Sequence, residues 1–186
     1  MDAMQGETTP SEPKTKVERT SDREVTVTRT FDAPAHLVFE AWSNPELFRR
    51  WWVPRSIGMA LTTCEMDVRT GGGYRLGFEG MDFFGRYLEV TPPSLIVWTN
   101  EEGGEDASVT TVALTETDGR TVVVVTERYP SAEALEADGA SEALPETFAQ
   151  LDELLVELAS LAQEGRFRIC QSGSYAISSP LVFPPV

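Results

Sequence analysis

Residues 145–162 of the chain read PETFAQLDELLVELASLA, and this stretch decides the fold. Its apolar residues recur at steps of three and four, which places them on one face of an α-helix: Phe148, Leu151, Leu155, Leu158 and Ala162. The opposite face is expected to be polar, with Glu146, Gln150, Glu153, Glu157 and Glu164. Pro145 suits the first helical turn, and Gly165 suits the end. A helix about 27 Å long needs an apolar partner surface.

The preceding chain supplies a β-sheet as that partner. In 23–31, Val25, Val27 and Arg29 alternate with threonines, which predicts a first strand. Six further strands are expected at about 57–68, 73–79, 83–91, 94–101, 107–116 and 121–128. Short connections rich in Gly, Pro and Asp separate them, so neighbouring strands should pair antiparallel.

Two short helices are expected between the first two strands. Pro34 lies in the first turn of one, and Asn44 and Pro45 begin the other, which should run over 46–51. The order of elements predicts an α+β fold, in which a seven-stranded, curved antiparallel sheet wraps around the long C-terminal helix. Where sheet and helix fail to meet, an apolar hollow can remain.

The chain divides into three parts on composition. Residues 1–22 are poor in apolar residues and are expected to be disordered. Residues 23–164 form the predicted domain. Residues 165–186 contain several Pro and Gly residues and are interpreted as a C-terminal tail.

Charge and cysteine content exclude several classes of function. The net charge is −15, and nine acidic residues but no Lys or Arg lie between Tyr129 and Gly165. Nucleic acids and anionic lipids, which need basic surfaces, are therefore not expected as partners. No apolar run is long enough to span a membrane, and no apolar signal core is apparent, so a cytoplasmic location is expected. His36 is the single histidine, and Cys64 and Cys170 are far apart, so neither a metal site nor a cofactor is predicted.

Four segments resemble one known family in sequence and in order: FDAPAHLVFEAWSNPELFRRWWVP, CEMDVRTGGGYR, GRYLEVTPPSLIVWTNE and ETFAQLDELL. This family is named after the activator of the heat-shock-protein-90 ATPase. It is a branch of the START/SRPBCC helix-grip superfamily, to which the birch-pollen allergens also belong. The resemblance covers about residues 23–162 and implies a cavity between the sheet and the long helix. It does not imply one activity, because such domains include lipid carriers, cyclases and co-chaperone domains.

Aromatic and aliphatic side chains on both sides of the expected cavity are candidates for its wall. Tyr74 and Phe78 share one face of a strand, and Trp98 lies on a similar strand. Of the adjacent Trp51 and Trp52, one is expected in the core and the other at the cavity mouth or at a partner contact. The predicted ligand-binding residues are Trp51, Trp52, Tyr74, Phe78, Trp98, Phe148, Leu151 and Leu155. The alternative is a filled core with no usable hollow.

Glu127 is the one candidate catalytic residue. It follows Val123 and Val125 on the same face of the last strand. If that face is turned toward the helix, the carboxyl group enters an apolar hollow, where burial would raise its pKa. Arg69 and Arg86, with Glu65 and Glu89, could orient a ligand, but exposed ion pairs are the favoured interpretation.

Three functions remain open on the sequence. The first is a non-catalytic domain that binds a small hydrophobic or amphipathic molecule in the cavity. The second is a cyclase- or hydrolase-type enzyme that uses Glu127. The third is a stress-response protein that contacts a chaperone through the sheet or through the acidic helix face, where Glu153 and Glu157 lie. A homodimer is a further alternative for its assembly.

Overall fold

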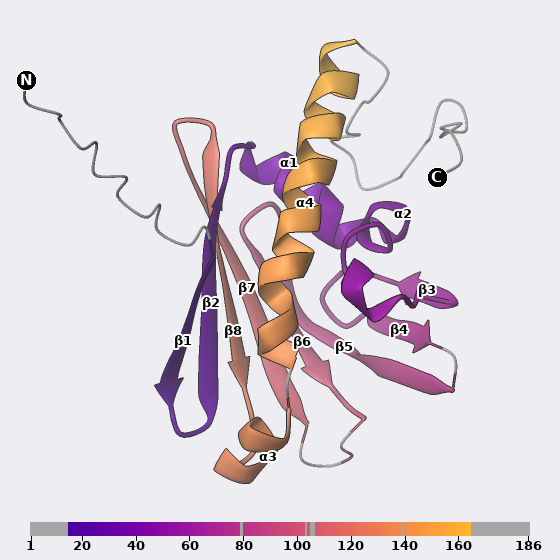
Figure 1. Ribbon diagram of the computed structural model, residues 1–186, viewed down its shortest axis with the longest axis vertical. Helices are drawn as coiled ribbons and strands as arrows, with labels where there is room; N and C mark the ends of the chain where they lie inside the picture. The colour runs from indigo at the N-terminus through magenta and orange to yellow at the C-terminus, as the bar shows by residue number, and fades with distance from the viewer. Residues whose placement is uncertain (1–14, 79, 103, 105–106, 139, 165–186) are drawn as a thin grey trace, which may run out of the picture.

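A single antiparallel sheet organises the computed structural model, which describes residues 15–78, 80–102, 104, 107–138 and 140–164. The sheet has eight strands in the order β1-β2-β8-β7-β6-β5-β4-β3 (Figure 1). Their bounds are β1 Thr15–Ser21, β2 Glu24–Phe31, β3 Thr63–Met66, β4 Gly73–Phe78, β5 Met81–Thr91, β6 Leu95–Asn100, β7 Ser108–Thr117 and β8 Arg120–Arg128. All neighbouring strands pair antiparallel, as predicted.

Strand β1 corrects the expected strand count from seven to eight. It lies within the segment 1–22, whose polar composition favoured disorder, yet Thr15–Ser21 pairs along β2 at the edge of the sheet. Six of its seven residues are exposed, so no apolar alternation marks it in the sequence. Residues 1–14 and the predicted tail 165–186 lie outside the described residues. A second difference is β3, which is limited to four residues where 57–68 was expected.

In the described part of the chain, five helical segments accompany the sheet: α1 Ala35–Ser43, α2 Pro45–Phe48, the 3₁₀ turn η1 Arg55–Ile57, α3 Ala132–Ala137 and α4 Ala140–Gln163. Asn44 caps α2 as predicted, because its side chain accepts a hydrogen bond from the Glu46 amide at 3.0 Å. That helix is shorter than the expected 46–51. Helix α4 begins five residues before Pro145, so the prediction that this proline starts the helix is wrong.

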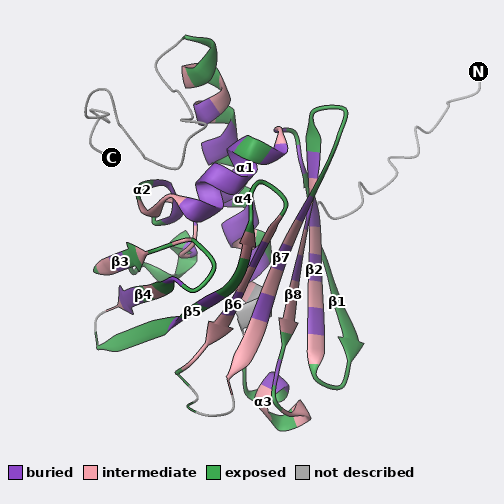
Figure 2. Ribbon diagram, turned by 180° about the vertical axis from the view of Figure 1, so that it is seen from behind, coloured by how far each residue is buried: buried purple, intermediate pink, exposed green. Residues whose placement is uncertain are grey.

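Helix α4 packs across the concave face of the sheet and forms the core there (Figure 1). Phe148, Leu151, Leu155 and Leu158 are almost completely buried, whereas Ala162, which was assigned to the same face, is exposed. The main contacts of α4 are with β1, β2 and α1. Seen from behind, the central strands alternate buried and partly exposed residues, and edge strand β1 is exposed (Figure 2).

A buried cation ties α4 to the first two strands. Arg29 of β2 forms an ion pair with Asp152 of α4, and it donates a hydrogen bond to Thr15 Oγ1 of β1 at 2.8 Å. The guanidinium also lies 5.4 Å from the centre of the Phe31 ring. The same alternation that placed Arg29 beside Val25 and Val27 therefore turns it toward the helix.

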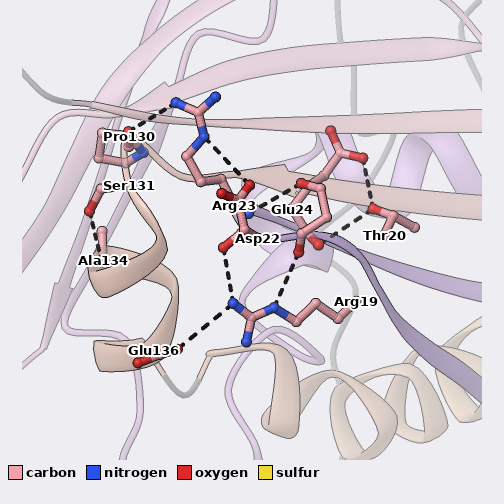
Figure 3. A network of polar contacts seen from close by, with 10 residues as sticks. Arg19, Thr20, Asp22, Arg23, Glu24, Pro130, Ser131, Ala134 and Glu136 are labelled. Atoms are coloured by element: carbon pink, nitrogen blue, oxygen red, sulfur yellow. Dashed lines mark hydrogen bonds and ion pairs between the residues drawn. The ribbon is translucent and has the colours of Figure 1, made fainter.

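Polar contacts fasten the β1–β2 hairpin to the segment around α3 (Figure 3). Arg19 donates to the carbonyls of Ser21 and Asp22 and faces Glu136 of α3 at 3.9 Å. Arg23 donates to the carbonyl of Pro130 at 3.5 Å. These contacts position the chain that leaves β8 and leads to α4. No helix of the described segments combines the length and the apolarity needed to cross a membrane.

Candidate functional site: a cavity between sheet and helix

A cavity of about 420 Å³ lies between the sheet and the N-terminal half of α4. Its floor is formed by strands β3 to β8, and its roof by Ala143, Leu144 and Thr147 of α4. The segment after α2 completes the wall with Trp52, Val53 and residues up to 59. The cavity exists because α4 packs mainly on β1, β2 and α1, so it does not cover the whole concave face.

Strand alternation explains which side chains reach the floor. Residues two apart on β4 line the cavity, namely Tyr74, Leu76 and Phe78, and the same spacing holds for Ile96 and Trp98 on β6. Trp42 of α1 also contributes, and its ring lies 6.1 Å from that of Trp98. The β3–β5 side of the cavity is therefore aromatic and aliphatic.

The cavity opens through an apolar rim. Ile57, Met59, Met81 and Phe83 line the cavity and are nevertheless 42–55% exposed. Three methionine side chains therefore line the wall, namely Met59, Met66 and Met81. Methionine is unbranched and polarisable, so such a wall adapts to ligands of different shape.

Asn100 is the centre of a polar group on the β6–β7 side of the cavity. Its Oδ1 accepts hydrogen bonds from the Tyr74 hydroxyl at 2.8 Å and from Trp98 Nε1 at 3.0 Å. Its Nδ2 donates to Ser108 Oγ and to Thr110 Oγ1, both at 3.0 Å. Asn100 thus fixes two aromatic wall residues in place.

Glu127 lies on the concave face, beside this polar group. In the strand register Trp98 pairs with Thr110, and Thr110 pairs with Glu127, so the three residues form one row across β6, β7 and β8. Glu127 also lines the cavity. The Tyr129 hydroxyl is 3.0 Å from Glu127 Oε2 and 2.8 Å from Asp138 Oδ2.

The surroundings of Glu127 disfavour its ionised form. Burial raises the pKa of Glu127 above the ordinary carboxyl value, and the nearby Asp138 carboxylate raises it further. The hydrogen bond from Tyr129 acts in the opposite direction and is the smaller effect beside burial. Burial likewise raises the pKa of the Tyr129 hydroxyl, so Tyr129 stays protonated and donates. A carboxyl group whose pKa is raised by burial in a cavity is a candidate general acid or base.

The eight predicted ligand-binding residues separate into two groups. Trp52, Tyr74, Phe78 and Trp98 lie on the cavity wall. The other four do not line it and belong to the packed core: Trp51, Phe148, Leu151 and Leu155. For Phe148, Leu151 and Leu155 the expected place on the wall is wrong, because α4 turns that stretch onto β2 and α1 instead of toward the hollow. Trp51, which follows α2, is the tryptophan of the pair that lies in the core.

The adjacent tryptophans divide as the sequence predicted. Trp51 is fully buried, and its Nε1 donates to the carbonyl of Ala41 at 3.0 Å. Trp52 is partly exposed and stacks on Phe48, with ring centres 4.8 Å apart. Only Trp52 faces the cavity.

Gln150 was assigned to the polar face of the long helix, opposite the apolar stripe, but at Gln150 that face is covered. The side chain is buried, and its Nε2 donates to the carbonyls of Trp51 and Val53, both at 2.8 Å. Its Oε1 accepts from the Arg55 amide at 2.8 Å. Gln150 therefore holds residues 51–55, which continue into the cavity wall.

The charged pairs considered for ligand orientation lie outside the cavity. Arg69 pairs with Asp67 at 2.9 Å and Arg86 with Glu101 at 3.0 Å, and both arginine side chains are largely exposed. Glu65 and Glu89 are exposed as well. Neither Arg69 nor Arg86 is therefore a partner of Glu127 in the chemistry suggested from sequence. Within the described residues no group of His, Cys, Asp or Glu is arranged to hold a metal ion.

The acidic face of α4 is partly occupied by the protein's own arginines. Glu153 pairs with Arg55 at 2.9 Å, and Glu157 pairs with Arg50 at 2.6 Å. Charge reversal at these glutamates would break contacts within the domain as well as any contact with a chaperone. It is therefore a poor test of chaperone binding.

Several wall residues were missed in the sequence although a signal for them existed. Asn100 follows Ile96 and Trp98 at the same two-residue spacing, so strand parity alone places it on the floor. Trp42 lies four residues after Val38 on α1, and both are buried, so the helical period signals its inward face. Met81 fell outside the expected strand 83–91, because β5 begins two residues earlier.

A curved antiparallel sheet that encloses a long C-terminal helix and leaves a cavity between them defines the helix-grip class of proteins. The chain belongs to the family described as activator of Hsp90 ATPase homolog 1-like protein, which matches over residues 32–156. No curated protein matches the chain.

Solved structures support the same fold. A protein from Rhodobacter sphaeroides is 22% identical with a TM-score of 0.69, and the alignment covers 77% of this chain and 99% of that one. A protein from Nitrosomonas europaea is 21% identical with a TM-score of 0.66, over 75% of this chain and 98% of that one. A protein from Mycobacterium smegmatis is 25% identical with a TM-score of 0.63, over 76% and 97%.

Proposed function

We propose that this protein binds a small hydrophobic or amphipathic molecule in the cavity between the sheet and α4. The observation that carries the proposal is the cavity itself, about 420 Å³ in volume, with an apolar wall and a polar group on one side. Small-molecule sites have volumes of roughly 300–1,000 Å³ and this combination of surfaces. The exposed rim of Ile57, Met59, Met81 and Phe83 provides a route of entry.

Apolar burial would supply the driving force. A ligand that buries about 200 Å² of apolar surface gains roughly 5 kcal/mol before the costs of association are subtracted. The wall residues are already held by contacts within the protein, as Trp98 and Tyr74 are by Asn100. Little ordering of side chains is then needed on binding.

The test compares two alanines of α4 that differ in their surroundings. Ala143 lines the cavity, whereas Ala149 is exposed on the same helix. In a native mass-spectrometry and thermal-shift screen of lipids and aromatic polyketides, we expect binders of the wild-type protein. Ala143→Trp should abolish binding by filling the cavity, and Ala149→Trp should not. The absence of any binder, or equal binding to both variants, would contradict the proposal.

Catalysis in the same cavity is the second candidate function. It is supported by the position of Glu127 on the cavity wall and by the raised pKa of this carboxyl group. Glu127 would act as a general acid or base in a cyclisation or a hydrolysis. Once a binder is found, its mass is followed during incubation with the protein. A loss or gain of water by the binder that occurs with the wild-type protein and not with Glu127→Gln supports catalysis. A binder recovered unchanged contradicts it.

A further inference from the structure

We propose that the cavity selects a hydrophobic amine, whose ammonium group is held by Glu127 beside the ring of Trp98. This inference rests on the proposed function and adds the chemical class of the ligand. Three features of the cavity support it: the signs of the charges on the wall, the direction in which wall polarity changes, and the hydrogen-bond donors at the polar side.

All charged side chains that line the cavity are acidic. They are Glu102, Glu127 and Asp138, and within the described part of the chain no Lys, Arg or His lines the wall. The whole chain carries a net charge of −15, so the long-range field has the same sign. A carboxylate or phosphate that entered this cavity beside Glu127 would meet a like charge, with no basic side chain on the wall among the described residues, which is unfavourable in a partly buried site.

Wall polarity changes across the sheet. On the β3–β5 side the lining is apolar at Met66, Leu76, Phe78 and Phe83, and the hydroxyl groups there are those of Tyr74 and Tyr87. The β6–β8 side carries Asn100, Ser108 and Glu127. A ligand with one apolar part and one polar part therefore fits in a single orientation, with its polar group toward β8.

The amide donors at the polar side are already in use. Both Nδ2 hydrogens of Asn100 are directed at Ser108 and Thr110. Glu127 has two carboxyl oxygens, and the single hydroxyl hydrogen of Tyr129 lies within reach of Oε2. In the described part of the chain Tyr129 is the one side chain that donates to Glu127. A ligand that brings N–H donors and positive charge complements this arrangement, and an acceptor does not.

Aromatic rings add to the preference for a cation. Trp98 and Glu127 lie in one row, two strand spacings or about 10 Å apart at the backbone. Their side chains both line the cavity and so can contact one group between them. An ammonium within about 6 Å of an indole centre is attracted to the ring face, and the attraction grows on removal from water.

The experiment uses three probes with the same decyl chain: 1-aminodecane, decanoic acid and 1-decanol. Each is titrated into the full chain by calorimetry, below the concentration at which micelles form and at about 0.15 M salt, so that the general field of the acidic protein is screened. We expect the amine to bind at least about tenfold more tightly than the acid, a difference of about 1.4 kcal/mol. Decanol should lie between them.

Two matched variants show whether Glu127 carries the preference. Glu127→Gln should weaken the amine about tenfold and leave decanol within about twofold, which also shows that the variant is folded. Glu89→Gln makes the same change at an exposed position outside the cavity and should leave all three affinities unchanged.

The outcomes separate this inference from the proposed function. If the acid binds as tightly as the amine, or if Glu127→Gln leaves the preference intact, the amine assignment is overturned while cavity binding stands. If none of the three probes binds the wild-type protein, both proposals are contradicted. An amine preference that persists in Glu127→Gln but is lost in Glu89→Gln would assign the effect to surface charge and overturn the inference.

Discussion

Glu127 is the residue on which the chemistry of the cavity depends. It ends a row that begins with the indole of Trp98, and it shares the Tyr129 hydroxyl with Asp138. Its neighbours on β8, Val123 and Val125, are buried in the core. A carboxyl group here loses part of its hydration on folding, and this has a measurable effect on stability.

The stability cost of Glu127 should depend on pH. In the folded protein the pKa of Glu127 is raised above 4.5. Between pH 4.5 and this raised pKa, the folded form keeps the proton on Glu127 and the unfolded form loses it. The free energy of unfolding therefore falls as the pH rises through this range. The glutamine in Glu127→Gln carries no charge at any pH. We therefore expect this substitution to raise Tm at pH 7 and to leave Tm unchanged at about pH 4. Glu89→Gln, which removes one charge at an exposed site, is the control. An equal gain for both variants, or a gain at low pH, would contradict the assignment.

Asn100 should stabilise the fold as well as the wall. Asn100→Leu removes the hydrogen bonds that Asn100 makes with the Trp98 indole N–H and with the Ser108 hydroxyl. We expect a loss of about 2 kcal/mol in the free energy of unfolding, measured by urea denaturation. In a Trp98→Phe background the loss should be smaller, because the orphaned indole donor is absent. Equal losses in both backgrounds would show that the Asn100–Trp98 hydrogen bond contributes nothing.

At the residue scale, strand parity predicted orientation well. It placed Tyr74, Phe78 and Trp98 on the concave face, and it turned Glu127 toward the helix. The helical period could not determine which residues of α4 face a hollow. Phe148 and Leu151 have the same apolar spacing in the sequence whether they contact a sheet or a cavity. Burial patterns report which face is covered, but not whether a gap remains beneath it.

At the scale of elements, α4 contacts the chain on more sides than its apolar stripe indicated. Its length and its buried stripe were predictable from the 3.6-residue period. The role of Gln150 was not, because glutamine is common on exposed faces and its partners are backbone atoms of a distant segment. Pro145 misled the prediction of the helix start, since proline is also accommodated inside the first turns of a helix that begins earlier.

Gln150 should be needed for the segment that borders the cavity. Gln150→Glu replaces the two donated hydrogen bonds by a carboxylate that faces the carbonyls of Trp51 and Val53. We expect a loss of about 2–3 kcal/mol in stability and faster hydrogen exchange over 51–57. Glu153→Gln, which alters an exposed ion pair to Arg55, should cost less than about 1 kcal/mol. A Gln150→Glu variant as stable as Glu153→Gln would contradict this role.

At the scale of the whole molecule, stability and ligand binding should depend on different parts. Arg29 links β1 and β2 to α4, whereas none of the residues that line the cavity comes from β1 or β2. The edge strand β1 was missed in the sequence because it packs on one side only and carries Lys16, Glu18 and Arg19, which are typical of protected sheet edges.

Removing residues 1–22 should therefore lower Tm without lowering affinity. A fragment that begins at residue 23 loses the partner strand of β2 and the hydrogen bond between Arg29 and Thr15. A fragment that begins at residue 15 is the control. We expect a lower Tm and more aggregation for the shorter fragment, because β2 becomes an open edge. The dissociation constant for 1-aminodecane should be unchanged. An unchanged Tm would show that β1 contributes nothing to the domain.

The most direct test of the account is a crystal structure of the protein with the hydrophobic probe that gives the largest thermal shift. We expect density for the probe within the space bounded by Trp52, Tyr74, Trp98 and Leu144, with its polar group toward Glu127. Density only on the outer surface of the sheet, or a wall that has collapsed to leave no room for the probe, would contradict it.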